Sequence, residues 1–221
     1  MNFWTITVAL LVLYIIYRTY KKNKQKKEKT LNDKWLGALQ IAHDAKDYKE
    51  VITLVGNKEL TSDKLCYVYG NALLMTGETG KGRSIFKKAF SFGDKNATRK
   101  IFGFSELNAG NYKEAISLLQ EIEKDYLAIQ FKYDDGYDII ENLGIAFMEL
   151  EKYDLAIEAF KGAPIGKKNI VDGLNKIFIL LGQCYEKKGD SKNAIKFYTK
   201  SIAYRYNEDL QNKIDEIGTE K

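Results

Sequence analysis

The chain has 221 residues, a net charge of +5, one histidine and two cysteines. Seven basic residues and one acidic residue lie between Arg18 and Thr30, so the rest of the chain is close to neutral and lacks the basic face that duplex nucleic acid requires. The cysteines are too few for a secreted, cross-linked scaffold. With a single histidine, the chain also has too few residues for a histidine–cysteine metal site and little support for a catalytic triad.

The amino terminus is apolar. Residues 1–17 carry no charged side chain, and at about 1.5 Å per residue they would form a helix of roughly 26 Å, at the short end of a bilayer span. Aromatic residues, which favour membrane interfaces, occur at both ends of the stretch: Phe3 and Trp4, then Tyr14, Tyr17 and Tyr20. We therefore expect residues 1–20 to form a transmembrane anchor.

Two alternatives for this segment stay open, a cleaved signal peptide and an apolar helix packed into the rest of the protein. A signal peptide has basic residues before its apolar run and small residues at a cleavage site, whereas here the basic residues follow the run. Because basic residues are retained in the cytoplasm, we expect a single-pass membrane protein whose main domain faces the cytoplasm.

Residues 21–31 are expected to form a basic juxtamembrane linker. Each lysine near an anionic membrane surface contributes about 1 kcal/mol of binding free energy. The alternative is that these lysines only determine the topology of the anchor and do not bind lipid headgroups. No aromatic residue is interleaved among them, which disfavours single-stranded nucleic acid. The lysines expected at lipid headgroups are Lys21, Lys22, Lys24, Lys26 and Lys27.

The clearest pattern in the chain is Asn142–Pro164, which predicts two antiparallel helices. Large and small residues recur three to four apart, so that they share one face of each helix. Gly144 lies on that face without a side chain and lets the second helix come close. Pro164 ends the second helix. The residues of the two faces are Leu143, Ala146 and Phe147, then Ala156, Ile157, Phe160 and Ala163.

Four further copies of the pattern follow one another along the chain. Glycine recurs at the matching position, at spacings of 33, 41 and 38 residues, as Gly70, Gly103, Gly144 and Gly182. The 41-residue spacing indicates an insertion at Asp125–Tyr137, which we expect to lengthen the flanking helices or to form a loop, with a partner-specific contact as its functional alternative. The other copies are Asn32–Leu60, Ser62–Phe92, Asn96–Tyr126 and Lys168–Tyr206.

A last helix is expected after the fifth copy. Asn207 can cap it, and its apolar side chains are spaced to cover the open end of the array. These are Leu210, Ile214 and Ile217.

The residues Leu143-Gly144-x-x-Phe147, followed by Ala156-x-x-x-Phe160-x-x-Ala163, resemble the tetratricopeptide repeat. The resemblance covers residues 32–206. It implies an all-α fold, a right-handed superhelical α-solenoid of about five helical hairpins. We expect one N-terminal transmembrane helix before this solenoid, and a capping helix and tail at residues 207–221.

In this family the concave surface is lined by first-helix side chains that do not face the second helix. Some relatives grip a terminal carboxylate with five residues, of which Lys100, Asn142 and Lys176 have counterparts here, whereas Phe104 and Leu180 depart from the pattern. A groove for an extended or helical peptide is therefore favoured over a clamp. The register places in it Asn71, Lys100, Phe104, Asn142, Met148, Lys176 and Gln183.

Nothing in the sequence predicts catalysis. His43 is interpreted as a solvated or capping residue, and Cys66 and Cys184 as buried structural thiols. The glycine-rich stretch Thr76–Gly82 lacks the spacing of a phosphate-binding loop and is interpreted as a turn. We expect no catalytic residue, cofactor or metal.

The sequence predicts a membrane-anchored scaffold or adaptor that recruits a protein or peptide through its concave groove. Two alternatives stay open. One is an exported, extracytoplasmic assembly factor with the same fold, and the other is a non-catalytic regulatory subunit of a membrane-associated enzyme. The identity of the partner is not encoded in these patterns.

Overall fold

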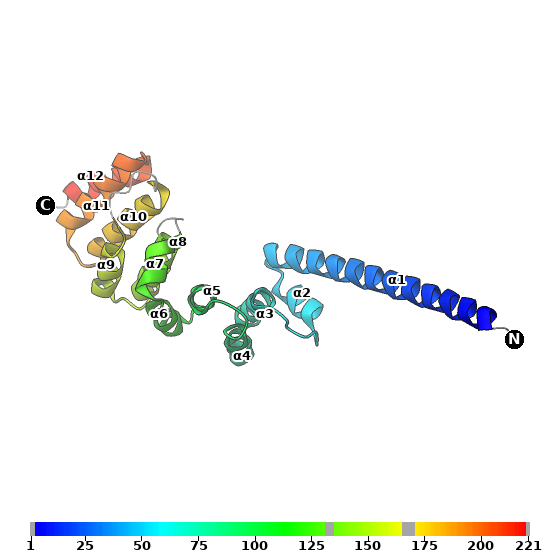
Figure 1. Cartoon of the computed structure of the whole chain (residues 1–221). Helices are drawn as coiled ribbons and strands as arrows, with labels where there is room; N and C mark the ends of the chain where they lie inside the picture. Colours follow the sequence, from blue (N-terminus) through cyan, green and yellow to red (C-terminus); the bar gives the residue numbers. More distant parts are fainter. Residues whose placement is uncertain (1–2, 131–134, 165–170, 220–221) are drawn as a thin grey trace. The chain divides into compact units, whose positions relative to one another are not determined.

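The computed structural model describes the backbone of residues 3–130, 135–164 and 171–219, with side chains described from Tyr17 onward except at 27–28, 30–31, 135 and 171–172. The described backbone is helical and contains no strand. It divides into two compact units, residues 1–59 and 60–221, which we describe separately (Figure 1).

The first unit is one long helix followed by a short one. Helix α1 (Phe3–Asp44) is unbroken, so that the expected linker and the first helix of the first repeat belong to a single rod. Helix α2 (Tyr48–Val55) begins at Asp47, whose side chain accepts a hydrogen bond from the amide of Glu50. The indole of Trp35 donates to the carbonyl of Leu54 at 2.8 Å, which ties the two helices together.

The expected membrane span lies at the start of α1. The side chains of residues 1–16 fall outside the described part of the chain. Within the described part, no helix is sufficiently long and apolar to cross a bilayer.

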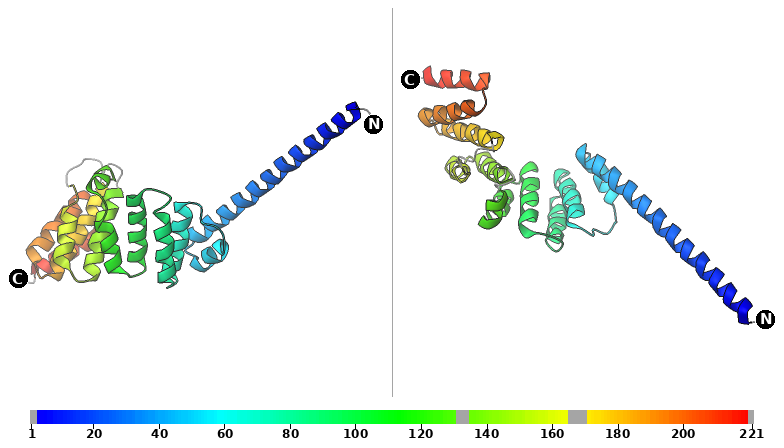
Figure 2. Two further views of the ribbon diagram at one scale, coloured as in Figure 1. Left: turned by 60° about the horizontal axis from the view of Figure 1, so that its bottom comes forward. Right: turned by 45° about the horizontal axis from the view of Figure 1, so that its top comes forward.

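The second unit is a series of antiparallel helical hairpins (Figure 2). The predicted second to fifth repeats and the final helix are all present. Their helices are α3 (Asp63–Met75), α4 (Thr79–Ala89), α5 (Lys95–Asn108), α6 (Tyr112–Gln120), α7 (Lys124–Gln130), α8 (Asp135–Glu149), α9 (Tyr153–Lys161), α10 (Val171–Lys187), α11 (Ser191–Tyr204) and α12 (Glu208–Thr219).

The insertion between the third and fourth repeats agrees with the prediction at its end, where Asp135–Tyr137 begin the flanking helix α8, and differs from it at its start. Its first part forms a short helix of its own, α7, instead of lengthening α6 or forming an open loop. Leu127 packs on the apolar cluster that contains Leu119 and Ile139, which explains why this segment becomes ordered. Residues 131–134 of the insertion lie outside the described residues.

Close packing of the fourth and fifth hairpins depends on glycine. A Cβ atom added at Gly144 would lie 2.1 Å from Cε1 of Phe160, and one at Gly182 would lie 2.2 Å from Cε1 of Tyr198. Both aromatic rings are fully buried. The predicted close approach of the second helix to the glycine of the first is therefore confirmed.

The second and third repeats are joined by an ion pair whose carboxylate is buried and whose guanidinium is partly exposed. Glu106 on α5 is fully buried and accepts hydrogen bonds from Arg83 on α4, 2.7 Å from Nε to Oε1 and 3.2 Å from Nη2 to Oε2. The hydrogen bond to Glu106 raises the pKa of Arg83 and keeps the guanidinium charged. Phe86 and Phe102 stack beside it with ring centres 4.4 Å apart.

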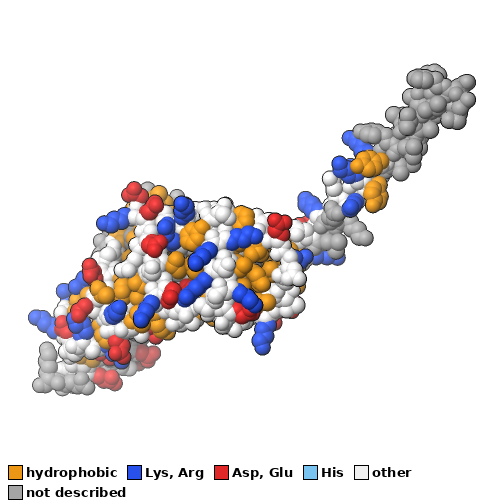
Figure 3. All heavy atoms as spheres, turned by 90° about the horizontal axis from the view of Figure 1, so that it is seen from below, with side chains coloured by type: hydrophobic (Ala, Val, Ile, Leu, Met, Phe, Trp, Pro, Cys, Tyr) orange, Lys and Arg blue, Asp and Glu red, His pale blue; other side chains and the backbone are white. Residues whose placement is uncertain are grey.

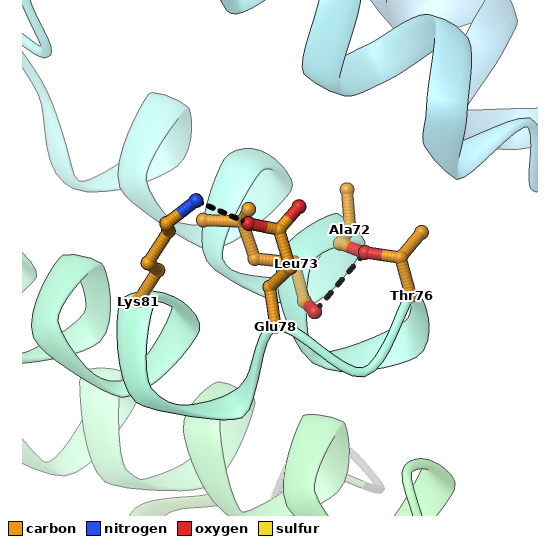
Figure 4. A network of polar contacts seen from close by, with 5 residues as sticks. All are labelled: Ala72, Leu73, Thr76, Glu78 and Lys81. Carbon is orange, nitrogen blue, oxygen red and sulfur yellow. Dashed lines mark hydrogen bonds and ion pairs between the residues drawn. The ribbon is translucent and has the colours of Figure 1, made fainter.

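The glycine-rich stretch of the second repeat is a turn only at Thr76–Glu78, because Thr79–Gly82 form the first turn of α4. It connects α3 to α4, and Thr76 Oγ1 donates to the carbonyls of Ala72 and Leu73 at 3.0 and 3.2 Å (Figure 4). Lys81 Nζ lies 2.5 Å from Glu78 Oε2 on the first turn of α4. The Thr76 side chain therefore caps the end of α3, whereas no side chain caps the start of α4.

The same turn position recurs in all five repeats with a left-handed backbone. Glycine occupies it in the second, third and fifth repeats, at Gly77, Gly110 and Gly189 with φ of 86°, 78° and 73°. Lys46 and Glu151 adopt φ of 56° in the first and fourth repeats. A residue with a Cβ atom has a higher conformational energy than glycine in this left-handed region.

The final helix closes the array as predicted. Asn207 Oδ1 accepts a hydrogen bond from the amide of Leu210 at 3.1 Å. Leu210 is buried in a cluster with Tyr198, and Ile214 and Ile217 pack against that cluster. The cap therefore covers apolar surface that the fifth hairpin would otherwise expose.

Both cysteines are free and fully buried, as expected for structural thiols. Burial raises the pKa of the Cys184 thiol to about 12. Burial also raises the pKa of Cys66, against a smaller opposing effect of Lys88. Neither thiol is therefore nucleophilic at neutral pH.

Candidate partner-binding surface

A hollow of about 450 Å³ lies among the helices α8, α9, α10 and α12. Two of the predicted groove residues, Met148 and Gln183, come together there from adjacent repeats. Both are half-buried on first helices, as the register predicts for residues of the groove. The lining residues are Met148, Glu149, Glu151, Tyr153, Gln183, Glu186, Lys187 and Lys213.

Glu186 connects the hollow to the capping helix. Its Oε2 accepts a hydrogen bond from Tyr198 Oη at 2.6 Å and forms an ion pair with Lys213 Nζ at 2.9 Å. Burial alone would raise the pKa of Glu186, but the hydrogen bonds from Tyr198 and Lys213 outweigh it, so that the pKa lies below its usual value. The carboxylate is therefore charged at neutral pH and links α10 to α12 through its ion pair with Lys213.

Two further glutamates stand at the edge of the hollow. Glu149 accepts a hydrogen bond from the hydroxyl of Tyr112, which raises the pKa of that tyrosine. Glu151 is exposed and holds the left-handed backbone at which three other repeats have glycine. A strained residue kept beside a surface hollow is a reason to look for function there.

The hollow offers several kinds of contact. Gln183 carries both a donor and an acceptor, Met148 is a flexible apolar side chain, and Tyr153 is half-buried at the opposite side. Carboxylates and ammonium groups stand around them. This combination suits the backbone amides and mixed side chains of a peptide better than the reacting atoms of a substrate.

The remaining predicted groove residues lie apart from the hollow. The Asn142 side chain donates to the carbonyl of Asp138 in its own helix at 2.7 Å, and Lys176 Nζ lies 3.6 Å from Glu141 Oε2 on α8. Phe104 packs on the apolar cluster of Leu119, Ile122 and Ile139. Asn71 on α3 and Lys100 on α5 are half-buried.

Sequence reasoning missed Glu186 and Lys213. The signal for Glu186 was present, because it follows Gln183 by three residues and so shares its helix face. The contribution of Lys213 had no local signal, since α12 reaches the hollow only through tertiary packing.

The amino-acid sequence of α10 and α11 supports the same interpretation. Residues 176–208 match the family model of the tetratricopeptide repeat. These residues are a tetratricopeptide repeat. The match covers most of the fifth repeat, which contributes Gln183, Glu186 and Lys187 to the hollow. A search of curated proteins finds no match.

Solved structures share the arrangement of tetratricopeptide hairpins. MamA of MSR-1 superposes with a TM-score of 0.55 at 18% identity over 77% of this chain and 94% of its own. PilF of Pseudomonas aeruginosa superposes with a TM-score of 0.57 at 14% identity, over 85% of this chain and 89% of its own. The C-terminal part of a TPR repeat-containing protein from Cytophaga hutchinsonii superposes with a TM-score of 0.54 at 17% identity, over 76% of this chain and 63% of its own. The fold is a tetratricopeptide-type α-solenoid.

Proposed function

We propose that this protein is a membrane-anchored adaptor that binds a protein or peptide partner through the hollow formed by α8, α9, α10 and α12. The observation that carries the proposal is the meeting of Met148 and Gln183, two residues assigned to the groove by register alone, at a hollow of about 450 Å³. Partner binding in this fold uses first-helix side chains, and both residues are on first helices.

The lining favours a peptide with side chains of both charges. Three carboxylates and two ammonium groups surround the hollow, and complementary charges would fix the direction and register of a bound chain. Each contact is weak by itself in a water-exposed site. Specificity would therefore come from several contacts made together.

Site-specific cross-linking tests this surface. A photoreactive residue replacing Gln183 should cross-link to a discrete partner in cells, whereas the same residue replacing the exposed Gln120 on α6 should not. With the cross-linked partner in purified form, Met148→Ala together with Gln183→Ala should weaken binding about tenfold, the loss of roughly 1.4 kcal/mol. Equal cross-linking from both positions, or unchanged affinity of the double variant, would remove the hollow from the proposal.

The membrane part of the proposal is supported by the sequence of α1. The uncharged residues 1–17 are followed by a basic segment in which Lys21, Lys22, Lys24 and Lys26 are all exposed. Because α1 is unbroken, Tyr20 at the expected interface and the buried Leu39 of the first repeat would be separated by roughly 28 Å of helix. Tethering would raise the local concentration of a membrane-bound partner, so that modest affinity suffices.

Carbonate extraction and protease protection test the anchor and its orientation. The full chain should resist extraction from membranes, a chain without residues 1–20 should be released, and the repeat domain should resist protease in intact cells. Extraction of the full chain would disprove the anchor. Digestion of the repeat domain in intact cells would instead favour the exported assembly factor.

A further inference from the structure

A stripe of lysines runs along the outer side of α11, away from the hollow. Lys192, Lys196 and Lys200 follow one another at intervals of four residues and are all exposed, and Tyr204 continues the series with 42% of its surface exposed. Residues four apart lie one above another on a helix. We call these four residues the α11 stripe.

Aromatic rings hold two of these lysines in place. Lys200 Nζ lies 5.5 Å from the ring centre of Phe178 and 5.4 Å from that of Phe197, and Lys196 Nζ lies 5.7 Å from Phe197. Phe178 also contacts the ring of Tyr204, with centres 5.7 Å apart. The rings beneath are buried. The ammonium groups are thus held at the surface by the contacts of their stems and charges with the rings.

The stripe lacks the counter-charges found on neighbouring lysines. Lys188 is paired with Asp154, and Lys213 with Glu186. For the three lysines of the stripe, no carboxylate of the described residues lies within ion-pair distance. Asp190 at the start of the helix accepts hydrogen bonds from Asn193, and the charge of the nearby Lys192 also helps to lower the pKa of Asp190, so that Lys196 and Lys200 are the two lysines of the stripe without a nearby counter-charge among the described residues. Like charges four residues apart destabilise a helix slightly, so an anion bound along the stripe would relieve this repulsion.

Basic and apolar side chains are mixed at the surface of this fold, as the face drawn in Figure 3 illustrates. Beside the stripe, Lys161 of α9 donates from Nζ to Tyr185 Oη at 2.9 Å and lies over the Tyr185 ring. Tyr185 in turn stacks on Phe197 with ring centres 5.5 Å apart. One connected set of rings therefore supports a fourth ammonium group next to the α11 stripe.

We infer that the α11 stripe binds an extended acidic segment of a partner protein, with a carboxylate at every second residue. Lysines four apart on a helix are separated by about 6 Å along its axis. Side chains two apart on an extended peptide are separated by roughly 6.8 Å and point to the same side. Three successive carboxylates can therefore meet three successive ammonium groups, and an apolar residue next to them can meet Tyr204.

This surface is carried by a second helix, whereas the hollow is formed mainly by first helices and the cap, so the two sites are separate. A protein that occupies both would bind around the edge of the fifth repeat. Removing the function of one site should leave binding at the other unchanged.

The test uses the full chain and fluorescein-labelled peptides. The probe is an octapeptide of alternating Glu and Thr, and its neutral control alternates Gln and Thr. We expect measurable binding of the acidic probe alone, at least tenfold weaker binding to K192Q/K196Q/K200Q, and less than twofold weaker binding to K64Q/K87Q/K113Q, which removes equal charge from α3, α4 and α6. Circular dichroism confirms that both triple variants remain folded.

Three results would overturn the inference. They are equal binding of the acidic and neutral probes, equal loss in the two triple variants, and self-association of the unmodified protein that K192Q/K196Q/K200Q abolishes in sedimentation. The first two would reduce the stripe to a solvated face. The third would make a second copy of this chain its occupant.

Discussion

The second and third repeats are held together differently from the fourth and fifth. In α8–α11 the packing is apolar and tight, with an added Cβ at Gly144 or Gly182 only 2.1 or 2.2 Å from an aromatic carbon. At Gly70 the corresponding distance, to the ring of Phe86, is 2.8 Å, and the small residue on the partner helix is Gly82. Between the second and third repeats, the Phe86–Phe102 stack is supplemented by the ion pair of Arg83 on α4 with the buried Glu106 on α5.

The difference shows how a repeat can depart from its pattern and still stack. Where small and large residues alternate completely, apolar packing alone specifies the contact. Where they do not, a buried charged pair fixes the register, but it leaves an uncompensated charge if one partner is removed. The two halves should therefore fail through different substitutions.

The largest effect is expected at the ion pair. Arg83→Met should lower the free energy of unfolding by about 3 kcal/mol, because Glu106 would remain buried without its partner. Urea denaturation measures the change. The double variant Arg83→Met, Glu106→Leu should recover most of the lost stability, because it leaves no unpaired carboxylate in the interior. A double variant as unstable as the single one would show that the loss does not come from the unpaired charge of Glu106.

The apolar half should break at its glycines. Gly144→Ala should cost about 2–3 kcal/mol, because the new methyl group would overlap the Phe160 ring in a packed interior. Gly80→Ala in α4 is the matched control, since a Cβ there meets nothing within 4 Å, and it should be neutral or slightly stabilising. Similar losses in thermal melts of both variants would contradict tight packing at Gly144.

The contact between the fifth repeat and its cap should depend on pH. The pKa of Glu186 is lowered in the folded protein by Tyr198 and Lys213 against the effect of burial. Its contribution to stability is therefore complete above the ordinary carboxyl pKa of about 4.3 and is lost as pH falls through the lowered folded value. Unfolding at pH 7, 5, 4 and 3 should show a difference between the unmodified protein and Glu186→Gln that shrinks in acid. A constant difference would exclude this linkage.

The smallest effect is expected at the turn of the fourth repeat. Glu151→Gly should raise the free energy of unfolding by about 0.5–1 kcal/mol, because glycine accepts the left-handed backbone without strain. If Glu151 is kept for the hollow, the same variant should bind the cross-linked partner more weakly in titration calorimetry. A more stable variant that binds the partner equally well would show that the strained backbone of Glu151 has no role in binding at the hollow.

Much of the fold could be predicted from the sequence. The spacing of Gly70, Gly103, Gly144 and Gly182 located four hairpins, and Asn207 located the start of the capping helix, because helix periodicity and capping are local properties of the chain. Register also placed Met148 and Gln183 on the surface that forms the hollow. These features follow from interactions within a few turns of helix.

Tertiary structure alone decided the rest. Whether α7 would be a helix or a loop depended on the cluster of Leu119, Ile122 and Ile139 that receives it. The pairing of Glu186 with Lys213 joins residues of two helices, and Arg83 meets Glu106 across 23 positions of the chain. No local spacing encodes such contacts, because each depends on how neighbouring hairpins stack. The stacking of the hairpins therefore decided which charged residues meet at the hollow and between the second and third repeats.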